Sequence, residues 1–292
     1  MQTSTRFFLF NEDCIRGMRK IPDQGVNLVV TSPPYNRGID YGQYDDNKTK
    51  EAYLGWTLQW ATEAHRALSE TGSLFLNIGG APSNPLLPHE VLLKLSGLFI
   101  LQNTIHWIKA ITVRTPEGKE ISTGHFKPIT SKRFVNDCHE YIFHLTKTGT
   151  TRIDRLGVGV AYADKSNIKR WAHTRGRDRR CRGNNWYIPY KTIRNADAER
   201  PHPATFPVEL PIMCIRLHGW RSDLVMLDPF LGIGHSALAA KQCEIQAFIG
   251  FETNAEYLRL VRANLGLSGS AQTGHSPQKI DRALQGLVPA PL

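Results

Sequence analysis

The residues best suited to chemistry lie in the segment Thr31–Asn36 (TSPPYN), which closes and follows an apolar run, Val26–Val30. Ligands of α/β sheets bind where the strands end, so this loop is a candidate site. Its two prolines have a fixed φ and no N–H, while their carbonyl oxygens stay free to accept hydrogen bonds. An ordinary proline-rich turn is the alternative interpretation, and the position directly after a buried strand favours the functional one.

Such a loop suits methyl transfer to the exocyclic amino group of a nucleic-acid base. That nitrogen is a poor nucleophile because its lone pair is conjugated into the ring. Acceptors that bind its two hydrogens favour a pyramidal, more nucleophilic nitrogen and act on the developing positive charge. We expect the Ser32 hydroxyl and the Pro33 carbonyl to be these acceptors. Pro33 and Pro34 stiffen the loop, and Tyr35 is expected to stack on an extruded base.

A second candidate segment, Asp228–Gly234 (DPFLGIG), follows another apolar run and opens an expected helix. Glycines at a strand-to-helix turn let the backbone approach a ligand closely. The G-x-G spacing lacks the third glycine of the dinucleotide fingerprint, which favours S-adenosylmethionine over NAD. Glu252 ends the next expected strand, where an acid can bind the two hydroxyls of a ribose. A tight turn without a ligand is the alternative.

Together these residues resemble the β-group of amino DNA methyltransferases. In that family an S/D-P-P-Y segment lies near the N-terminus and an F-x-G-x-G segment near the C-terminus, and this chain has the same order. The resemblance covers roughly Phe7 to Leu265. Further segments similar to family elements are Asn11–Cys14 (NEDC), His139–Lys147 (HEYIFHLTK), Trp186–Pro189 and His202–Pro207.

The resemblance implies S-adenosyl-L-methionine as cofactor and double-stranded DNA as partner, with base flipping and a restriction-modification role. The chain departs from the family at the cofactor turn, where Leu231, Ile233 and His235 replace small residues and a threonine. This departure bears on cofactor affinity and leaves the role of His235 open. The cofactor-binding residues that we expect are Asp13, Cys14, Thr31, Thr205, Phe206, Asp228, Phe230, Gly232, Gly234 and Glu252.

The residue before Pro-Pro-Tyr bears on the target base. In the family, Ser is commoner in cytosine-N4 enzymes and Asp or Asn in adenine-N6 enzymes, so Ser32 favours N4 of cytosine, with N6 of adenine as the alternative. Cytosine-C5 chemistry needs a cysteine nucleophile, normally after proline, and no Pro-Cys occurs. The intact Ser32–Tyr35 segment argues against the hypothesis of a DNA-binding protein that has lost catalysis. A protein or RNA methyltransferase is opposed by the order of the motifs.

The elements that must position these residues alternate between strands and helices. Short runs that are apolar throughout are typical of parallel strands buried on both faces. The pattern predicts an α/β fold with a doubly wound, mostly parallel, Rossmann-like methyltransferase sheet. The expected strands are Phe7–Phe10, Val26–Thr31, Ser73–Gly79, Glu140–Thr146, Asp223–Asp228 and Gln246–Glu252. The expected helices are Glu51–Leu68, Leu87–Leu95, Pro207–Leu217, Ser236–Gln242 and Asn254–Leu265.

Two polar stretches, Arg114–Asn136 and Thr148–Arg200, interrupt this pattern, and the second contains a strongly basic segment. The net charge of the chain is +10, and Lys165–Arg182 holds eight basic residues against one acid. Such a segment favours a polyanion, because its charges neutralise phosphates and give affinity without sequence choice. A solvated basic loop is the alternative. The expected DNA-binding residues are Lys165, Lys169, Arg170, Arg175, Arg177, Arg179, Arg180 and Arg182, with base contacts from Trp171, His173 and Asn184 or Asn185.

We expect residues 1–147 to form the catalytic part of the core, 148–200 an inserted target-recognition region, 201–266 the cofactor-binding part and 267–292 a flexible tail. The loop Arg37–Lys50, with Tyr41 and Tyr44, is expected to close over the flipped base or simply to pack.

Five scattered cysteines without a C-x-x-C pair argue against zinc and for a cytoplasmic, nucleoid-associated protein. The sequence shows no membrane segment. It leaves open a monomer or a homodimer, and whether a restriction endonuclease accompanies the protein.

Overall fold

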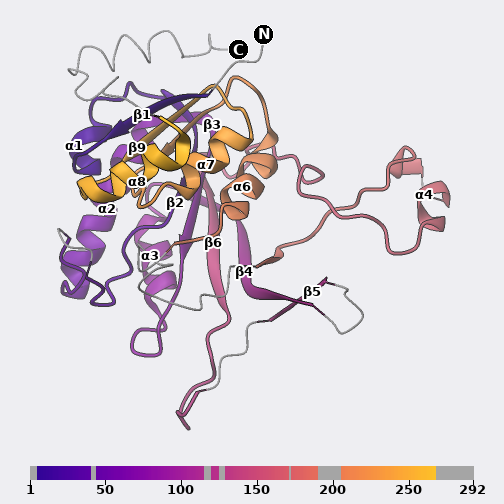
Figure 1. Cartoon of the computed structure of the whole chain (residues 1–292), viewed down its shortest axis with the longest axis horizontal. Coiled ribbons are helices and arrows are strands. Elements are labelled where there is room, and N and C mark those ends of the chain that lie inside the picture. Colours follow the sequence, from indigo (N-terminus) through magenta and orange to yellow (C-terminus); the bar gives the residue numbers. More distant parts are fainter. Residues whose placement is uncertain are drawn as a thin grey trace.

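The strands of the protein form one sheet with helices on both of its faces (Figure 1). The computed structural model describes residues 5–40, 44–114, 120–124, 129–170, 172–189 and 205–267. Within those residues the elements are β1 (Arg6–Phe10), α1 (Cys14–Met18), β2 (Val26–Thr31), α2 (Lys50–Ala67), β3 (Leu68–Ile78), α3 (Leu87–Leu95), β4 (Ile100–Arg114), β5 (Glu120–Gly124), β6 (His139–Thr146), α4 (Ser166–Arg170), the 3₁₀ turn η1 (Ala172–Thr174), β7 (Asn185–Pro189), α6 (Glu209–Gly219), β8 (Val225–Asp228), α7 (His235–Gln242), β9 (Ala247–Phe251) and α8 (Ala255–Leu265).

The strand order is β1-β9-β8-β2-β3-β6-β4-β5, and β7 pairs with β4. Strands β1, β9, β8, β2 and β3 are parallel neighbours, which confirms the doubly wound, mostly parallel prediction. Strand β6 runs antiparallel to both β3 and β4, although its sequence suggested another parallel strand. Its apolar composition follows from burial within the sheet, whereas its direction is set by the connections to its neighbours.

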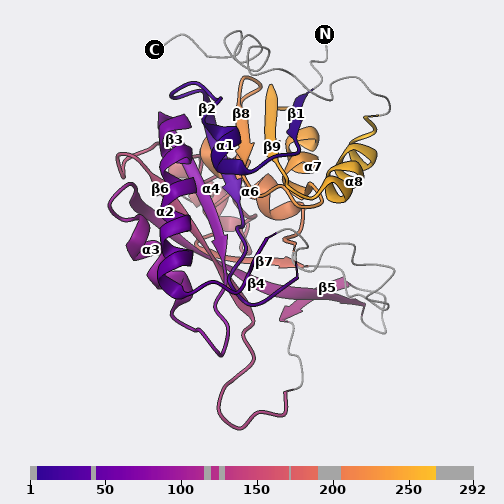
Figure 2. The ribbon, with the colours of Figure 1, turned by 90° about the vertical axis from the view of Figure 1, so that its left-hand side faces the viewer.

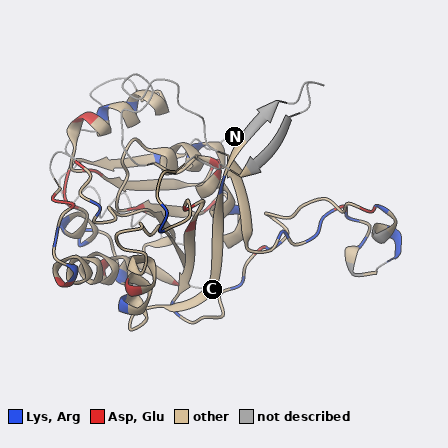
Figure 3. Ribbon diagram, turned by 90° about the horizontal axis from the view of Figure 1, so that it is seen from below, with Lys and Arg blue, Asp and Glu red and all other residues tan. Residues whose placement is uncertain are grey.

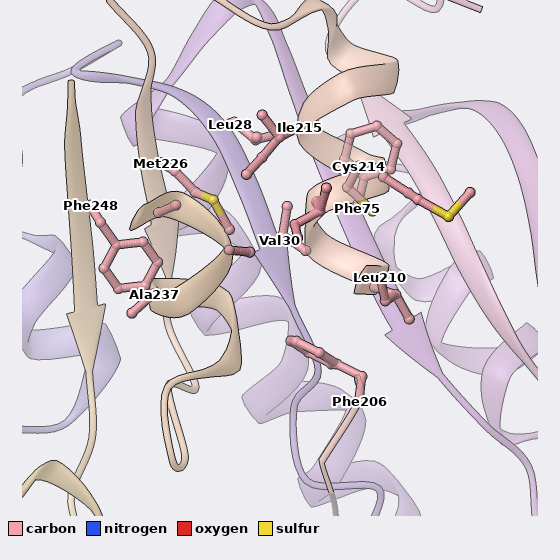
Figure 4. Close-up of a cluster of buried hydrophobic side chains, with 14 of the residues drawn as sticks. Leu28, Val30, Phe75, Phe206, Leu210, Cys214, Ile215, Met226, Ala237 and Phe248 are labelled. Atoms are coloured by element: carbon pink, nitrogen blue, oxygen red, sulfur yellow. The ribbon is translucent and has the colours of Figure 1, made fainter. Parts of the chain in front are cut away.

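The continuous apolar run of β2 is explained by cores on both sides of the sheet. Val29 packs into a cluster with residues of α1, α2 and α3, while Leu28 and Val30 face a second cluster formed with α6, α7 and α8. Figure 2 shows β3, β2, β8, β9 and β1 side by side across the sheet, in the order of their pairing. Figure 4 shows Leu28 and Val30 beside Ile215 of α6. Each such buried side chain contributes about 1.5–3 kcal/mol.

Three strands were not predicted from the sequence: β4, β5 and β7. The first expected polar stretch begins where β4 ends, and its residues Glu120–Gly124 form β5, which pairs antiparallel with the end of β4. The second stretch returns to the sheet as β7, which lies parallel to β4. Both polar stretches, which the sequence analysis described only as interruptions of the strand and helix pattern, therefore contribute a strand to the sheet. Among the described strands, β5 and β7 pair only with β4, and such edge strands make their backbone hydrogen bonds without needing a fully apolar sequence, which hides them from pattern analysis.

The remaining expected elements are present, with small differences at their ends. Strand β2 and helix α3 have the predicted bounds, and β3 begins earlier than expected, at Leu68. The segment after Asn11 adds a short helix, α1. Over the described part of the chain, no helix is long and apolar enough to cross a bilayer. The division of the chain into catalytic, recognition and cofactor parts stays a prediction.

Candidate active site

The two predicted motifs meet at the carboxyl ends of adjacent strands. Thr31 is the last residue of β2 and Asp228 the last residue of β8. The Thr31 hydroxyl donates to Oδ1 of Asp228 at 2.7 Å, across 197 positions of sequence. The Ser-Pro-Pro-Tyr loop and the glycine turn therefore begin from a single, hydrogen-bonded point at one edge of the sheet.

Asp228 is buried and its carboxylate is surrounded by donors from the protein. Oδ1 also accepts from the backbone N–H of Phe230 at 3.0 Å, and Oδ2 accepts from the Ser236 hydroxyl at 2.5 Å. Burial raises the pKa of the Asp228 carboxyl to about 6, although the hydrogen bonds from Ser236 and Thr31 act against that rise. Asp228 thus ties the turn to β2 and α7. A direct contact of Asp228 or Thr31 with a cofactor stays a prediction.

The turn after β8 needs its two glycines. Gly232 and Gly234 have φ values of 55° and 84°, in the left-handed region that favours glycine. A Cβ at Gly234 would lie 2.7 Å from Cγ1 of Val261 on α8, which is closer than side chains pack. The backbone N–H of Gly232 donates to Oε2 of Glu252 at 2.9 Å. The turn is consequently held against the neighbouring acid. Cofactor binding by Phe230, Gly232, Gly234 and Glu252 stays a prediction.

Glu252 and Asp13 lie after the ends of the adjacent strands β9 and β1. Oε1 of Glu252 accepts from the Asn254 N–H at 2.8 Å, and burial raises the pKa of this carboxyl. Oδ1 of Asp13 accepts from the Arg16 N–H at 3.0 Å and so caps α1. The Asn11 amide donates to the Glu252 carbonyl at 2.9 Å and joins the two loops. Each carboxylate has about four lone-pair positions, so capacity remains for the hydroxyl and amino groups of a ligand.

Cys14 and Phe206, two other expected cofactor residues, are buried. Burial, together with the nearby Asp13 carboxylate, raises the pKa of the Cys14 thiol. A contact of Cys14 with a cofactor stays a prediction. The Phe206 carbonyl accepts from Nδ1 of His235 at 2.6 Å. His235 thus holds the segment that begins at the exposed Thr205 against the start of α7, a role that the sequence left open. Contacts of Thr205 and Phe206 with a cofactor stay predictions.

Aromatic side chains of α2 pack against the turn. The ring of Phe230 lies 5.4 Å from those of both Trp56 and Trp60. The ring of Tyr44 lies 5.0 Å from that of Trp56, which agrees with simple packing of this tyrosine. Tyr41 lies outside the described residues. Closure of this loop over a flipped base stays a prediction.

The Ser-Pro-Pro-Tyr loop is anchored from both ends. The Tyr53 hydroxyl of α2 donates to the Pro34 carbonyl at 2.8 Å. A substrate role for the Pro33 carbonyl stays a prediction. Oγ of Ser32 lies 2.8 Å from Oη of Tyr35. Tyr35 is buried, and the Arg37 guanidinium lies over its ring at 5.1 Å from the ring centre. Stacking of Tyr35 on a base stays a prediction, and it requires a free face of this ring.

Three residues that the sequence analysis did not assign complete this site. The Tyr35 hydroxyl lies 3.0 Å from Oε2 of Glu140 on β6, and Nδ2 of Asn77 on β3 lies 2.7 Å from the same oxygen. The Lys109 ammonium of β4 lies 2.9 Å from Oε1 of Glu140. An acid at the start of the otherwise apolar run His139–Thr146 was the one available signal. Its partners come from strands far away in the sequence.

Glu140 stays charged in this buried position. Burial raises its pKa, but the Lys109 ammonium and the hydrogen bonds from Lys109, Asn77 and Tyr35 lower it further, so the pKa lies below its ordinary value. Burial and the negative charge of Glu140 raise the pKa of Tyr35 well above its ordinary value. Gly79 leaves room for the acid, because a Cβ there would lie 2.8 Å from Cγ of Glu140.

The loop after Tyr35 is also fixed by one acid. The buried Asp46 carboxylate accepts backbone N–H groups of Asn36, Arg37 and Ile39 at 2.8, 3.0 and 3.0 Å. Asn36 has a φ of 54° and exchanges hydrogen bonds with the backbone of Lys48. The sequence analysis missed Asp46. Among several acids in a polar loop, only the folded chain distinguishes this one.

The expected DNA-binding residues lie on a projection that we call the basic arm (residues 160–182). Figure 1 shows it extending away from the sheet with α4 at its far end, and Figure 3 shows lysine and arginine side by side along it. Two backbone hydrogen bonds between Val160 and Arg180, at 2.9 and 2.8 Å, join its two limbs. Seven of the eight expected basic side chains are exposed, and Arg182 is half-buried.

Some of these side chains hold the arm together, and others are available to a partner. Arg179 and Arg182 donate to backbone carbonyls of residues 156–158, and Lys165 pairs with Asp178. Lys169, Arg170, Arg175 and Arg177 form no ion pair with any residue that the structure describes. Trp171 lies outside the described residues, as does the side chain of His173. The Asn184 amide donates a hydrogen bond to the Thr104 carbonyl.

Comparison with known proteins assigns this arrangement to a family. A family model described as DNA methylase matches residues 26–263. The Type II methyltransferase M.BglII of Bacillus subtilis is 29% identical over 262 residues, which are 86% of this chain and 66% of that protein, just under two thirds. The DNA adenine methyltransferase YhdJ of Escherichia coli is 25% identical over 261 residues, covering 86% of this chain and 80% of that protein.

Solved structures share the fold. The PvuII DNA methyltransferase, described as cytosine-N4-specific, matches with a TM-score of 0.66 at 21% identity and covers 98% of this chain and 93% of its own. A putative DNA modification methylase from Thermus thermophilus, complexed with S-adenosyl-L-methionine, matches with a TM-score of 0.57 at 23% identity, covering 92% and 96%. At these identities the likeness establishes the architecture alone.

Proposed function

The chain belongs to the DNA methylase family, and from that premise we propose that it transfers a methyl group from S-adenosyl-L-methionine to an exocyclic amino group of a base in double-stranded DNA. The observation that carries this proposal is the junction of Thr31 and Asp228. It joins a loop of preorganised acceptors to a glycine turn flanked by Glu252 at the carboxyl ends of neighbouring strands. Amino methylation needs the amine and the methyl donor side by side in this way.

The residues of the glycine turn suit the proposed cofactor. Gly232 places no side chain over its half-buried backbone, and the Glu252 carboxylate, fixed by two N–H donors, offers further acceptor positions to vicinal hydroxyls. Asp13, on the adjacent loop, offers the same to an amino or hydroxyl group. When bound, S-adenosylmethionine supplies an electrophilic methyl group on a positively charged sulfur. A solved neighbour of the same fold holds this compound.

The catalytic loop acts on the amine. The Ser32 hydroxyl oxygen and the Pro33 carbonyl accept the two amine hydrogens, which turns the nitrogen lone pair out of conjugation with the ring. They then stabilise the positive charge that develops on nitrogen as its bond to carbon forms. One hydrogen of the methylated amine then passes to solvent water as a proton, so the methylated base is neutral. Both acceptors are fixed before the reaction, because Pro34 is tied to Tyr53 and Ser32 to Tyr35.

For the target base we propose N4 of cytosine. Ser32 supplies a hydroxyl, a weaker acceptor than a carboxylate, at the position where the adenine-N6 members of the family usually have Asp or Asn. The cytosine-N4-specific PvuII enzyme shares the fold across nearly the whole chain. The second candidate is N6 of adenine, which the similarity to a DNA adenine methyltransferase favours. Relatives that are named Type II methyltransferases support a restriction-modification role beside a cognate endonuclease.

One experiment separates these functions. The purified chain is incubated with duplex DNA and tritiated S-adenosylmethionine, and the DNA is then digested to nucleosides for mass spectrometry. We expect N4-methyldeoxycytidine and its absence with the Ser32→Ala variant. N6-methyldeoxyadenosine would instead favour the second candidate. If the wild-type chain labels no DNA, including DNA from hosts without methylation, the proposed methyltransferase activity is refuted.

A further inference from the structure

Glu140 is buried beside the Ser-Pro-Pro-Tyr loop, where it is charged and hydrogen-bonded to Tyr35 of that loop. The contacts around it determine which way each hydrogen in the network points. The Glu140 carboxylate can only accept, and so can the backbone carbonyl of Asn77. These two oxygens lie 3.0 and 3.2 Å from the Tyr35 hydroxyl.

The Tyr35 hydroxyl has one hydrogen, and both of these neighbours require it. The bond to the charged Glu140 oxygen is the shorter and the stronger of the two. No hydrogen of Tyr35 is then left for Ser32, whose oxygen lies 2.8 Å away. The hydrogen in that contact must come from Ser32, which donates to Tyr35.

The hydrogen bonds of Asn77 also indicate that Tyr35 accepts from Ser32. Only its amide nitrogen can donate to the Glu140 carboxylate, at 2.7 Å, so the orientation of the amide is fixed. Its second hydrogen points to Oη of Tyr35 at 2.8 Å, whereas Oγ of Ser32 is at 3.5 Å. Tyr35 therefore donates once and accepts from Asn77 and Ser32, which uses its whole capacity.

We propose that Glu140 is a positioning residue that fixes the direction of the Ser32–Tyr35 hydrogen bond, so that the Ser32 oxygen presents its free lone pair to the substrate amine. This inference rests on the proposed function. A serine hydroxyl can rotate to donate or to accept, and only the accepting orientation helps an amine that carries two hydrogens. The negative charge of Glu140, held by Lys109, removes that freedom.

The decisive variant is Tyr35→Phe, which keeps the aromatic ring for stacking and removes only the hydroxyl. We expect the single-turnover rate of methyl transfer to fall roughly 10- to 100-fold, as for the loss of a charge-linked hydrogen bond. The Kd values for DNA and cofactor should stay unchanged. The matched control is Tyr141→Phe, next to Glu140 on β6, which should react at the wild-type rate.

The Glu140→Gln variant tests whether the negative charge of Glu140 sets the direction of the Ser32–Tyr35 hydrogen bond. Its amide oxygen would face the Lys109 ammonium, so its N–H groups would face Tyr35 and free the Tyr35 hydrogen for Ser32. The rate should fall as in Tyr35→Phe, and the double variant should be no slower than either single one, because one chain of bonds is broken in all three. Near-ultraviolet circular dichroism checks that each variant is folded.

Three results would overturn the inference: a wild-type rate in Tyr35→Phe, an equal loss in Tyr141→Phe, or losses that multiply in the double variant. If Glu140→Gln does not fold, the rates of Tyr35→Phe and Tyr141→Phe still test the inference. Failure of the proposed function is distinct, because the wild-type chain itself would then transfer no methyl group to DNA.

Discussion

At the scale of single residues, the three acids of the site differ in their surroundings and therefore in their roles. Burial raises the pKa of Asp228 to about 6, and its donors are all from the protein, so it joins the two motifs. Glu140 is held ionised by Lys109. Glu252 is bound by two N–H groups on one side and keeps acceptor capacity on the other, which is the arrangement suited to a ligand.

Replacing Glu252 by Ala should weaken cofactor binding and also loosen the glycine turn, because the carboxylate accepts the N–H groups of Gly232 and Asn254. Loss of the hydrogen bonds between this carboxylate and vicinal hydroxyls should raise the Kd for S-adenosylmethionine by about 10- to 100-fold, measured by isothermal titration calorimetry. The control is Glu256→Ala on α8, where the exposed side chain pairs with Arg259. An unchanged Kd in Glu252→Ala would place the cofactor elsewhere.

At the scale of elements, the loop after Tyr35 depends on one buried carboxylate. Asp46→Ala removes the acceptor of three backbone N–H groups, at Asn36, Arg37 and Ile39. We expect faster hydrogen exchange at these amides and a rate of methyl transfer lower by about tenfold, since the loop continues the catalytic motif. The adjacent Asp45→Ala, at an exposed position, is the control. Equal effects from both variants would show that Asp46 has no special role.

A buried histidine pair joins β3, β6 and α6. Nε2 of His144 and Nδ1 of His218 lie 3.0 and 2.9 Å from the Ser73 hydroxyl, and the Asn103 amide lies 2.9 Å from Nδ1 of His144. Burial lowers the pKa of His144 to about 3 and that of His218 to about 4. Both therefore stay neutral in the folded protein at pH values where histidines of the unfolded chain bind protons.

This difference should make the fold sensitive to acid. Below pH 6.5 the unfolded state binds the additional protons, so the free energy of unfolding falls from pH 6.5 towards pH 4 and is unaffected above 6.5. The loss at pH 5 is about 2 kcal/mol for each histidine. Urea unfolding at pH 7.5 and pH 5 measures it. His218→Asn should reduce the pH dependence, while the control His139→Asn should not, and an undiminished slope in His218→Asn would contradict the assignment.

At the scale of the whole molecule, the basic arm projects from the core that carries the candidate site (Figure 1). We therefore predict that affinity for DNA and chemistry can be separated. The combined replacement of Lys169, Arg170, Arg175 and Arg177 by Gln should weaken DNA binding at all sequences. It should reduce the slope of log K against log salt by roughly 0.9 for each DNA phosphate that the variant no longer neutralises. Fluorescence anisotropy at several salt concentrations measures this slope.

The control for the arm replaces basic residues on the body of the protein, Lys94 of α3 and Arg259 of α8. The slope should then stay close to that of the wild-type chain. Arg179 and Arg182 are left intact in all variants, because they bind backbone carbonyls and support the arm itself. If the body variant and the arm variant reduce the slope equally, the arm is not the principal DNA-binding surface.

The sequence by itself determined what depends on neighbouring residues. The run Val26–Thr31 predicted a strand buried on both faces, and it forms β2 between two cores. Gly232 and Gly234 predicted a special turn, since their left-handed φ is a property of the local backbone. Ser32 to Tyr35 stood out because consecutive prolines after a strand have few other uses. These signals also predicted the family and its fold.

Only the tertiary structure decided what depends on residues distant in the chain. The partnership of Tyr35 and Glu140 spans 105 positions, and no local pattern encodes it. Strands β4 and β7 are held by hydrogen bonds to partners that their own polar residues do not indicate. The direction of the Ser32 hydrogen bond follows from such distant groups, because a hydroxyl takes its orientation from the charges around it. The sequence supplied the candidate catalytic residue Ser32, and the packing of β2, β3, β4 and β6 fixed the hydrogen bonds around it.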